Sequence, residues 1–381
     1  MKTNLIYLFI FLLNSNNLLH AETLKLKHSP NPIIKELNAG EFKLINSGHK
    51  GDKNVLAFSG LVYDHKRHTL LAFGGGHATG LFPNSVHSFN LTTLTWKQLT
   101  PDVPPIEYSD KNAVMTKDGK KLGGVIFKGK PSPGSRHTYD GLTMSVDGSV
   151  MICAQAQEFI GAARSMPKPN GKKAGFYRDF YKGGNGLWLF DPDTSTWKVS
   201  TPAGLAAGYC LSESTPKQPD WIYIIGHKNV FHKVNIKTFE KRKIKSIHGV
   251  QGTPSMTYNP LDESFLVFPC GSRQKNITKI FRYDIQKETW TTIPAAGESP
   301  NTYNINVVYD SAQKVFCCFN NGYFFYWNPI EKMWYKHDKL LEESFTAKRM
   351  GHHHIYDPIN NAHLLVTGRW NTYAFKFPTA K

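Results

Sequence analysis

Side chains suited to acid–base chemistry recur at loop positions of this 381-residue sequence where Asp and Glu are scarce. His77 follows Gly74-Gly75-Gly76, and those glycines would let the backbone approach a ligand closely. Arg136 and His137 are adjacent at a second such position, and Arg273 occupies a third. A histidine can take or give a proton, and an arginine can neutralise a carboxylate on a substrate. We therefore expect His77 and His137 to be catalytic acid/base residues, with Arg273 or Arg136 against the carboxylate.

A sequence repeat predicts the elements that position these residues. Each repeat reads as four short strands joined by tight turns, and an aromatic residue ends the fourth strand. The legible repeats lie at 61–96, 137–200, 207–245, 257–290 and 308–334, with a partial one from 351 to about 377. The partial repeat lacks a fourth strand, which Glu41–Ile45 could supply. Pairing of the two chain ends in this way would close a ring and remove an exposed sheet edge.

The repeat resembles the kelch repeat in its Tyr and Trp positions and in the glycine pair Gly74-Gly75 after the second strand. A clean glycine pair occurs at that position in one repeat alone, while the strand order and the period extend over nearly the whole chain. The resemblance implies an all-β, kelch-like β-propeller. We expect six blades, and residues 101–136 are long enough to leave seven blades open.

In a four-stranded blade, the loop before the first strand and the loop between the second and third strands open on the same face. Polar residues gather at these positions, whereas the turns of the opposite face hold mostly turn-forming residues. We expect the polar face to bind substrate through His227, Gln251, Asn304, Arg349, His352, Arg369, Gln155, Lys172 and Arg178.

The net charge of +17 predicts a polyanionic partner. Two insertions, 101–136 and 158–186, belong to the polar face and add lysines and arginines to it. An acidic polysaccharide or oligosaccharide fits an exported basic protein better than nucleic acid does. No sequence stretch is long and apolar enough to predict a membrane span.

The N-terminus predicts export. Lys2, the apolar run Leu5–Leu13 and the small residue Ala21 are typical of a secretory signal peptide over 1–21. We therefore expect a secreted or periplasmic protein with one β-propeller domain over 22–381. The five cysteines include no CxxC pair, and we expect them to be buried small hydrophobes.

The sequence requires no cofactor. His352-His353-His354 would place two histidines on one face of a strand, which is too few ligands for a catalytic metal, although a structural ion stays open.

Scarcity of carboxylates on the polar face argues against a glycosidase that uses two of them. His, Tyr and Arg instead suit removal of the proton beside a uronic acid carboxylate, which is β-elimination. The chain is similar to propeller-fold polysaccharide lyases such as the ulvan lyases. Three alternatives remain: a non-catalytic carbohydrate-binding propeller, an exported epimerase of the sialic-acid type, and a galactose oxidase-like enzyme, for whose flanking domains the chain has no room.

Overall fold

The structure, a computed structural model, describes a protein built almost entirely from antiparallel strands. It describes residues 28–48, 56, 59–74, 84–104, 107–119, 121–154, 186–200, 210–226, 229–248, 250, 254–269, 276–300, 305–337, 353–367 and 370–378. Its helical elements in these ranges are short: α2 (Pro32–Lys35) and the 3-10 turn η2 (Asp110–Asn112). None of the described helices is long and apolar enough to cross a membrane. The expected signal peptide, 1–21, lies outside the described residues.

Most strands belong to four-stranded sheets whose order follows the sequence. They are β2 (Gly60–Asp64), β3 (Thr69–Phe73), β4 (Val86–Asn90) and β5 (Thr95–Gln98); β9 (Leu142–Met144), β10 (Met151–Cys153), β11 (Trp188–Asp191) and β12 (Thr196–Val199); β13 (Leu211–Ser214), β14 (Trp221–Ile225), β15 (Phe231–Asn235) and β16 (Lys241–Ile244); and β17 (Ser255–Asn259), β18 (Ser264–Phe268), β19 (Lys279–Asp284) and β20 (Thr289–Pro294). A further sheet holds β22 (Val308–Asp310), β23 (Val315–Asn320), β24 (Tyr323–Asn328) and β25 (Met333–Lys336), beside which β21 (Ala296–Gly297) runs parallel to β25.

The last sheet combines the two ends of the described chain. Strands β26 (His354–Asp357), β27 (Ala362–Val366) and β28 (Asn371–Phe375) are followed in it by β1 (Phe42–Ser47), which pairs antiparallel with β28. Phe42 lies opposite Phe375 in this pairing. A strand from near the N-terminus thus fills the position that we expected for Glu41–Ile45.

A local rule closes the hairpins. Asn90 Oδ1 accepts hydrogen bonds from the backbone N–H groups of Thr92 and Thr93, and Leu94 then adopts a left-handed φ of 54°. An Asn or Asp that caps a turn in this way is a common reason for these residues to occupy hairpin loops. The same pair of features occurs at Asp64 with His68, Asp191 with Ser195, Asn235 with Phe239, Asp284 with Glu288, Asp310 with Lys314, Asn328 with Lys332 and Asp357 with Asn361.

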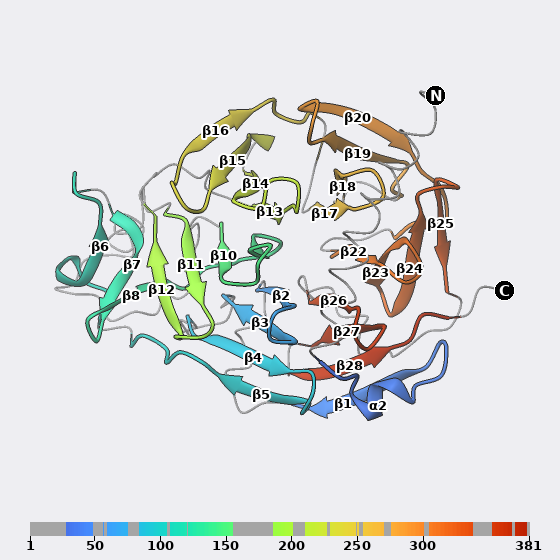
Figure 1. Cartoon of the computed structure of the whole chain (residues 1–381), viewed down its shortest axis with the longest axis horizontal. Coiled ribbons are helices and arrows are strands. Elements are labelled where there is room, and N and C mark those ends of the chain that lie inside the picture. The colour runs from blue at the N-terminus through green and yellow to red at the C-terminus, as the bar shows by residue number, and fades with distance from the viewer. Residues whose placement is uncertain are drawn as a thin grey trace, which may run out of the picture.

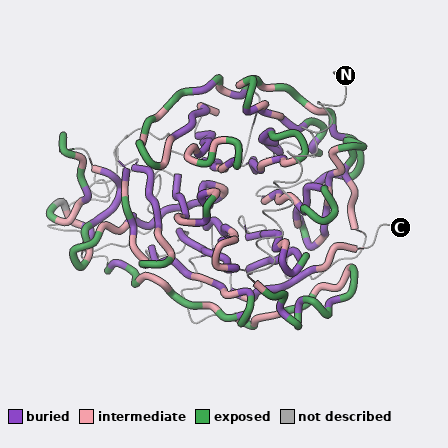
Figure 2. The backbone as a smooth tube through the Cα atoms, viewed as in Figure 1, coloured by how far each residue is buried: buried purple, intermediate pink, exposed green. Residues whose placement is uncertain are grey.

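The sheets lie around a common centre (Figure 1). The first strand of each sheet contacts the first strands of two others, in the order β2, β9, β13, β17, β22, β26 and back to β2. Buried apolar clusters fill the space between neighbouring sheets, and Figure 2 shows this burial along the inner strands. Aromatic pairs join neighbouring sheets, with ring centroids 4.8 Å apart for Phe73 and Trp197 and 4.7 Å apart for Phe324 and Phe375. This all-β arrangement is consistent with a β-propeller.

The insertion at 101–136 contains a separate three-stranded sheet of β6 (Ala113–Met115), β7 (Lys121–Phe127) and β8 (Lys130–Pro133). This sheet contacts β12 through β8 and lies at the outer side of the molecule (Figure 1). Nearly all of the second insertion, 158–186, lies outside the described residues. Cys153, Cys210, Cys317 and Cys318 are buried, as expected, and Cys270 lies outside the described residues.

Candidate functional site

Each sheet has two different ends at the centre of the molecule. We use "loop end" for the end at which the chain enters the first strand, and "turn end" for the end at which that strand runs into its hairpin turn. The predicted site belongs to the loop end. Of its residues, the structure describes Arg136 and His137. The others lie outside the described residues: His77, Arg273, Gln155, Lys172, Arg178, His227, Gln251, Asn304, Arg349, His352 and Arg369.

His137 lies in the segment that leads into β9. It is buried, and its Nδ1 atom is 3.2 Å from the hydroxyl of Tyr139. The two rings meet edge to face with centroids 5.5 Å apart. Tyr139 has a left-handed φ of 43°, which is uncommon for a bulky residue and is found more often at functional sites. A histidine and a phenol in hydrogen-bond contact form a pair that can exchange a proton.

The segment with His137 packs directly on the end of β3. The Thr138 hydroxyl donates to the carbonyl of Phe73 at 2.7 Å. A Cβ on Gly74, whose φ is +88°, would lie 2.6 Å from the Arg136 carbonyl oxygen. Gly74 is therefore required both for its conformation and for the close approach. Gly74 precedes His77 by three residues in the sequence.

Arg136 occupies a structural position. It is fully buried, its Nε atom donates to the carbonyl of Gly134 at 2.9 Å, and its guanidinium also donates to the carbonyl of Gly123. The guanidinium lies over the Trp188 ring, 5.8 Å from the ring centre. These contacts join the three-stranded sheet to β11. They do not favour a substrate-facing role for Arg136, which stays a prediction.

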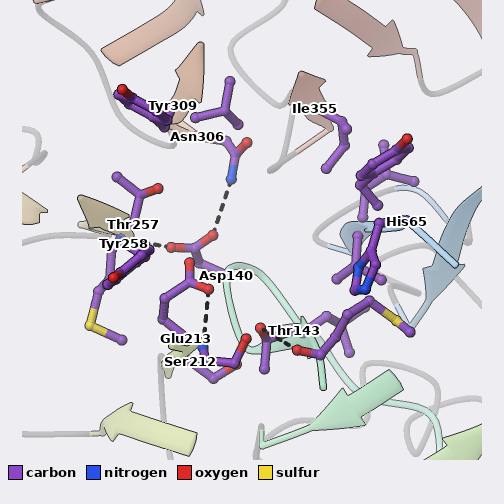
Figure 3. Close-up of a pocket in the computed structure, with 18 of the residues that line it drawn as sticks. His65, Asp140, Thr143, Ser212, Glu213, Thr257, Tyr258, Asn306, Tyr309 and Ile355 are labelled. Carbon is purple, nitrogen blue, oxygen red and sulfur yellow. Dashed lines mark hydrogen bonds between the residues drawn. The ribbon is translucent and has the colours of Figure 1, made fainter. Parts of the chain in front are cut away.

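Asp140 joins several sheets at the loop end. Its carboxylate accepts from the backbone N–H of Met256 at 2.9 Å and from the side-chain amide of Asn306 at 3.0 Å, and its carbonyl accepts from the N–H of Ser212 at 2.9 Å (Figure 3). Burial raises the pKa of Asp140 to about 7, against the opposing effect of these hydrogen bonds. The sequence analysis did not single out Asp140, because its role depends on contacts with residues of other sheets.

A cavity of about 620 Å³ runs from this junction toward the turn end. Its lining residues come from the first strands of the sheets and from the turns that follow, including His65, Val146 and Pro216. Glu213 of β13 is a second acid in the lining, and burial followed by the nearby Asp140 raises its pKa to about 8. Nothing in the sequence distinguished Glu213 from an exposed strand residue.

The histidine-rich segment forms a buried network. His353 contacts the Ser59 hydroxyl at 2.8 Å, and burial lowers its pKa to about 4. His354 Nε2 contacts His363 Nδ1 at 3.0 Å, and His363 Nε2 contacts Asp310 at 3.1 Å. Burial lowers the pKa of His354 well below its usual range. The two described histidines of this segment are therefore neutral at ordinary pH.

Asp310, His363 and the Cys317 thiol have ligand atoms within 4.8 Å of one another and form a group that could hold a metal ion. Burial raises the pKa of the Cys317 thiol, which opposes the thiolate form that binds metals. A second buried pair, His68 with Asp357 at 3.0 Å, bridges the next two sheets in the same manner. The recurrence of a His–Asp pair indicates a hydrogen bond between neighbouring sheets, and a structural ion stays a prediction.

Comparison with known proteins finds a similar fold and no family. No protein-family model and no curated protein matches the sequence. Among solved structures, a Bacteroides thetaiotaomicron protein of unknown function is similar, with a TM-score of 0.52 and 9% sequence identity. The similarity covers 91% of this chain and 74% of that one. At this identity the similarity concerns the fold alone.

Proposed function

We propose that the chain is an exported, kelch-like propeller of six blades, closed by β1, which cleaves an acidic, uronate-containing polysaccharide by β-elimination. The circular order of contacts among the first strands supports the six blades. The pairing of β1 with β28 supports the closure. The three-stranded sheet at 113–133 packs on the outer side of β12 and has no strand in that circle, which argues against a seventh blade. The net charge of +17 supports an anionic substrate.

One observation carries the catalytic part of the proposal. Gly74, which precedes His77 by three residues in the sequence, packs against Arg136 and Thr138 on either side of His137. This packing supports His77 and His137, which were chosen independently, as an acid/base pair at the loop end.

The reaction would need no cofactor. A basic side chain, His137 or its hydrogen-bonded partner Tyr139, takes the proton from the carbon beside the uronate carboxylate. The electron pair forms a carbon–carbon double bond as the bond to the departing glycosidic oxygen breaks, and His77 protonates that oxygen. Arg273 would neutralise the carboxylate and so stabilise the charge that develops beside it. The resulting product is an unsaturated uronate at the new chain end.

The experiment incubates the purified mature protein with a panel of uronate polysaccharides and follows the ultraviolet absorbance of the unsaturated product. We expect activity in the wild type and a loss of about 100-fold or more in His77→Ala and in His137→Ala, as is typical for a general acid or base. His65→Ala is the matched control, because His65 lies in a hairpin turn at the other end. It should keep full activity.

Product analysis separates the alternatives. An epimerase would change a sugar without forming a double bond, and a binding propeller would retain the polymer without changing it. Retained binding with no product across the panel would contradict the lyase and favour the carbohydrate-binding module.

A further inference from the structure

Three side chains of metal-binding type meet between the last two sheets. Asp310 ends β22, Cys317 lies in β23, and His363 comes from β27 of the closing sheet. A carboxylate oxygen, the thiol sulfur and a ring nitrogen from these residues all lie within 4.8 Å of one another. All three residues are fully buried. Carboxylate, thiolate and imidazole are the ligand types that zinc takes in proteins, so this enclosed group has the composition of a zinc site.

The hydrogen bonds that lead to this group have one hydrogen too few. A chain of three contacts runs from the carbonyl oxygen of Asn306 through His354 and His363 to the carboxylate of Asp310, with lengths of 3.3, 3.0 and 3.1 Å. Each of these contacts needs one hydrogen between its two atoms. A neutral imidazole carries a single N–H, and a carbonyl or carboxylate oxygen carries none. Two neutral histidines therefore supply two hydrogens for three contacts.

The missing hydrogen belongs to the contact between His363 and Asp310. The carbonyl of Asn306 can only accept, so the Nδ1 atom of His354 must carry a hydrogen. His354 Nε2 then accepts from His363 Nδ1, which leaves His363 Nε2 with a lone pair. This lone pair faces Asp310 Oδ2 at 3.1 Å, and two electron-rich atoms so close together repel each other unless a cation lies between them. The cation is an additional proton or a metal ion.

The second buried His–Asp pair, His68 with Asp357, has all the hydrogens that it needs. His68 Nε2 is 3.0 Å from Asp357 Oδ2, and His68 Nδ1 has no hydrogen-bond partner among the described residues. One neutral imidazole therefore supplies the one hydrogen of this contact. In the described part of the chain, no third His, Cys, Asp or Glu completes a metal-binding group with this pair. The missing hydrogen and the neighbouring thiol thus occur together at Asp310.

We propose that Asp310, Cys317 and His363 hold a structural zinc ion between the last two sheets. Zinc bonds to nitrogen and oxygen of about 2.0–2.2 Å place the two atoms about 3.4 Å apart at a tetrahedral angle. The 3.1 Å between His363 Nε2 and Asp310 Oδ2 is close to that spacing. Burial raises the pKa of the Cys317 thiol in the metal-free protein, and a bound zinc ion replaces the thiol proton directly. The site is independent of the proposed lyase chemistry, because it uses none of its residues.

The surroundings hold the ligands in position. A zinc-binding histidine normally donates its other ring N–H to a fixed acceptor, which here is His354 for His363. Asp310 Oδ1 accepts from the backbone N–H groups of Ala312 and Gln313, so Oδ2 is the oxygen directed at the ion. Because the ligand residues are fully buried, we expect the ion to enter while the chain folds and to resist chelators afterwards.

The experiment produces the mature protein in medium that contains zinc, cobalt(II) or a chelator, and purifies it in the presence of chelator. We expect about one zinc or cobalt ion per chain by elemental analysis. The cobalt form should show thiolate-to-cobalt charge-transfer absorbance in the near ultraviolet. Zinc-loaded protein should have a Tm about 5 °C or more above that of metal-free protein. Wild-type protein without bound metal and without this absorbance would overturn the proposal and leave a proton as the cation.

Variants of two adjacent cysteines locate the site. Cys317 and Cys318 are both fully buried in β23, but they belong to different apolar clusters on its two sides. Cys317→Ser should abolish the charge-transfer absorbance and remove most of the bound cobalt, and His363→Gln should also lose the metal. Cys318→Ser is the matched control and should retain both signals. Equal metal content and absorbance in Cys317→Ser and the wild type would contradict this site, whatever the outcome of the polysaccharide assay.

Discussion

The turn end and the loop end of the sheets are built by different means. At the turn end, an Asn or Asp caps most of the described hairpins through backbone N–H groups two and three residues further on. At the loop end, the contacts join residues far apart in the sequence, as when Asp140 accepts from Met256 and Asn306. The capped turns, which repeat along the chain, set the geometry of the hairpins. Long-range contacts, such as those of Asp140, instead position the polar residues of the loop end.

The difference also concerns charge. Several described basic residues of the hairpin turns pair with acids: Arg67 with Asp64 and Asp193, Lys217 with Glu263, and Lys237 with Asp220. At the loop end and in the cavity, burial raises the pKa of Asp140 to about 7 and that of Glu213 to about 8. The turn end thus pairs several of its charges within the protein, whereas burial at the centre favours the protonated form of two carboxyls.

The largest expected effect tests the turn end. Asp357 caps its own turn and bonds His68 and the Tyr63 hydroxyl of the neighbouring sheet, so Asp357→Ala removes several partners at once. We expect a loss of about 4 kcal/mol in the free energy of unfolding, measured by urea denaturation, because buried groups lose their hydrogen bonds. The control is Asp193→Ala, whose carboxylate is exposed and pairs with Lys66 and Arg67. It should cost under about 1 kcal/mol. Similar losses in both variants would mean that the buried bridge between sheets adds nothing.

The second prediction concerns the pH dependence of stability that arises from the buried carboxyls of Asp140 and Glu213. Asp140 and Glu213 have folded-state pKa values of about 7 and about 8, above those of an unfolded chain. Their contribution to stability is therefore complete below about pH 4 and decreases as the pH rises through 7 and 8. We expect the contribution of each carboxyl to fall by roughly 3 kcal/mol between about pH 5 and pH 8, measured by urea denaturation.

The variant Glu213→Gln isolates this contribution. It should be less pH-dependent than the wild type over that interval, because glutamine does not titrate. Glu263→Gln, at the surface, should retain the wild-type pH dependence. If the pH dependence of Glu213→Gln equals that of the wild type, Glu213 is ionised in the folded protein at neutral pH and the contrast between the two ends disappears.

The turn end was largely predictable from the sequence, and the loop end was not. Residue pairs such as Asn259-Pro260 and Asp357-Pro358 favour hairpin turns through local backbone chemistry. The strands on either side of these turns could therefore be predicted from the sequence. The outward position of the three-stranded sheet at 113–133 was not predictable, because it depends on Arg136 and Trp188 meeting across the insertion. Asp140 and Glu213 were missed for a similar reason. Their importance comes from desolvation by residues of other sheets, which no local pattern records.

The smallest expected effect tests the packing of the loop end and has a control within the chain. Gly74 and Gly119 both have a left-handed φ, of +88° and +78°. A Cβ on Gly119 would meet nothing within 4 Å, whereas a Cβ on Gly74 would lie 2.6 Å from the carbonyl oxygen of Arg136. Gly119→Ala should therefore cost about 1 kcal/mol for backbone conformation alone. Gly74→Ala should cost about 2 kcal/mol more, because the backbone contact must open.

The difference between the two variants in the free energy of unfolding, measured by urea denaturation, reports the strength of the contact between the His137 segment and the end of β3. If the lyase proposal holds, Gly74→Ala should also lose polysaccharide cleavage under conditions in which it stays folded, since His77 follows Gly74 by three residues. Gly119→Ala should keep that activity. Equal costs for the two alanine variants would show that β3 and the segment 136–138 are not in close contact, and would remove the observation on which the catalytic assignment depends.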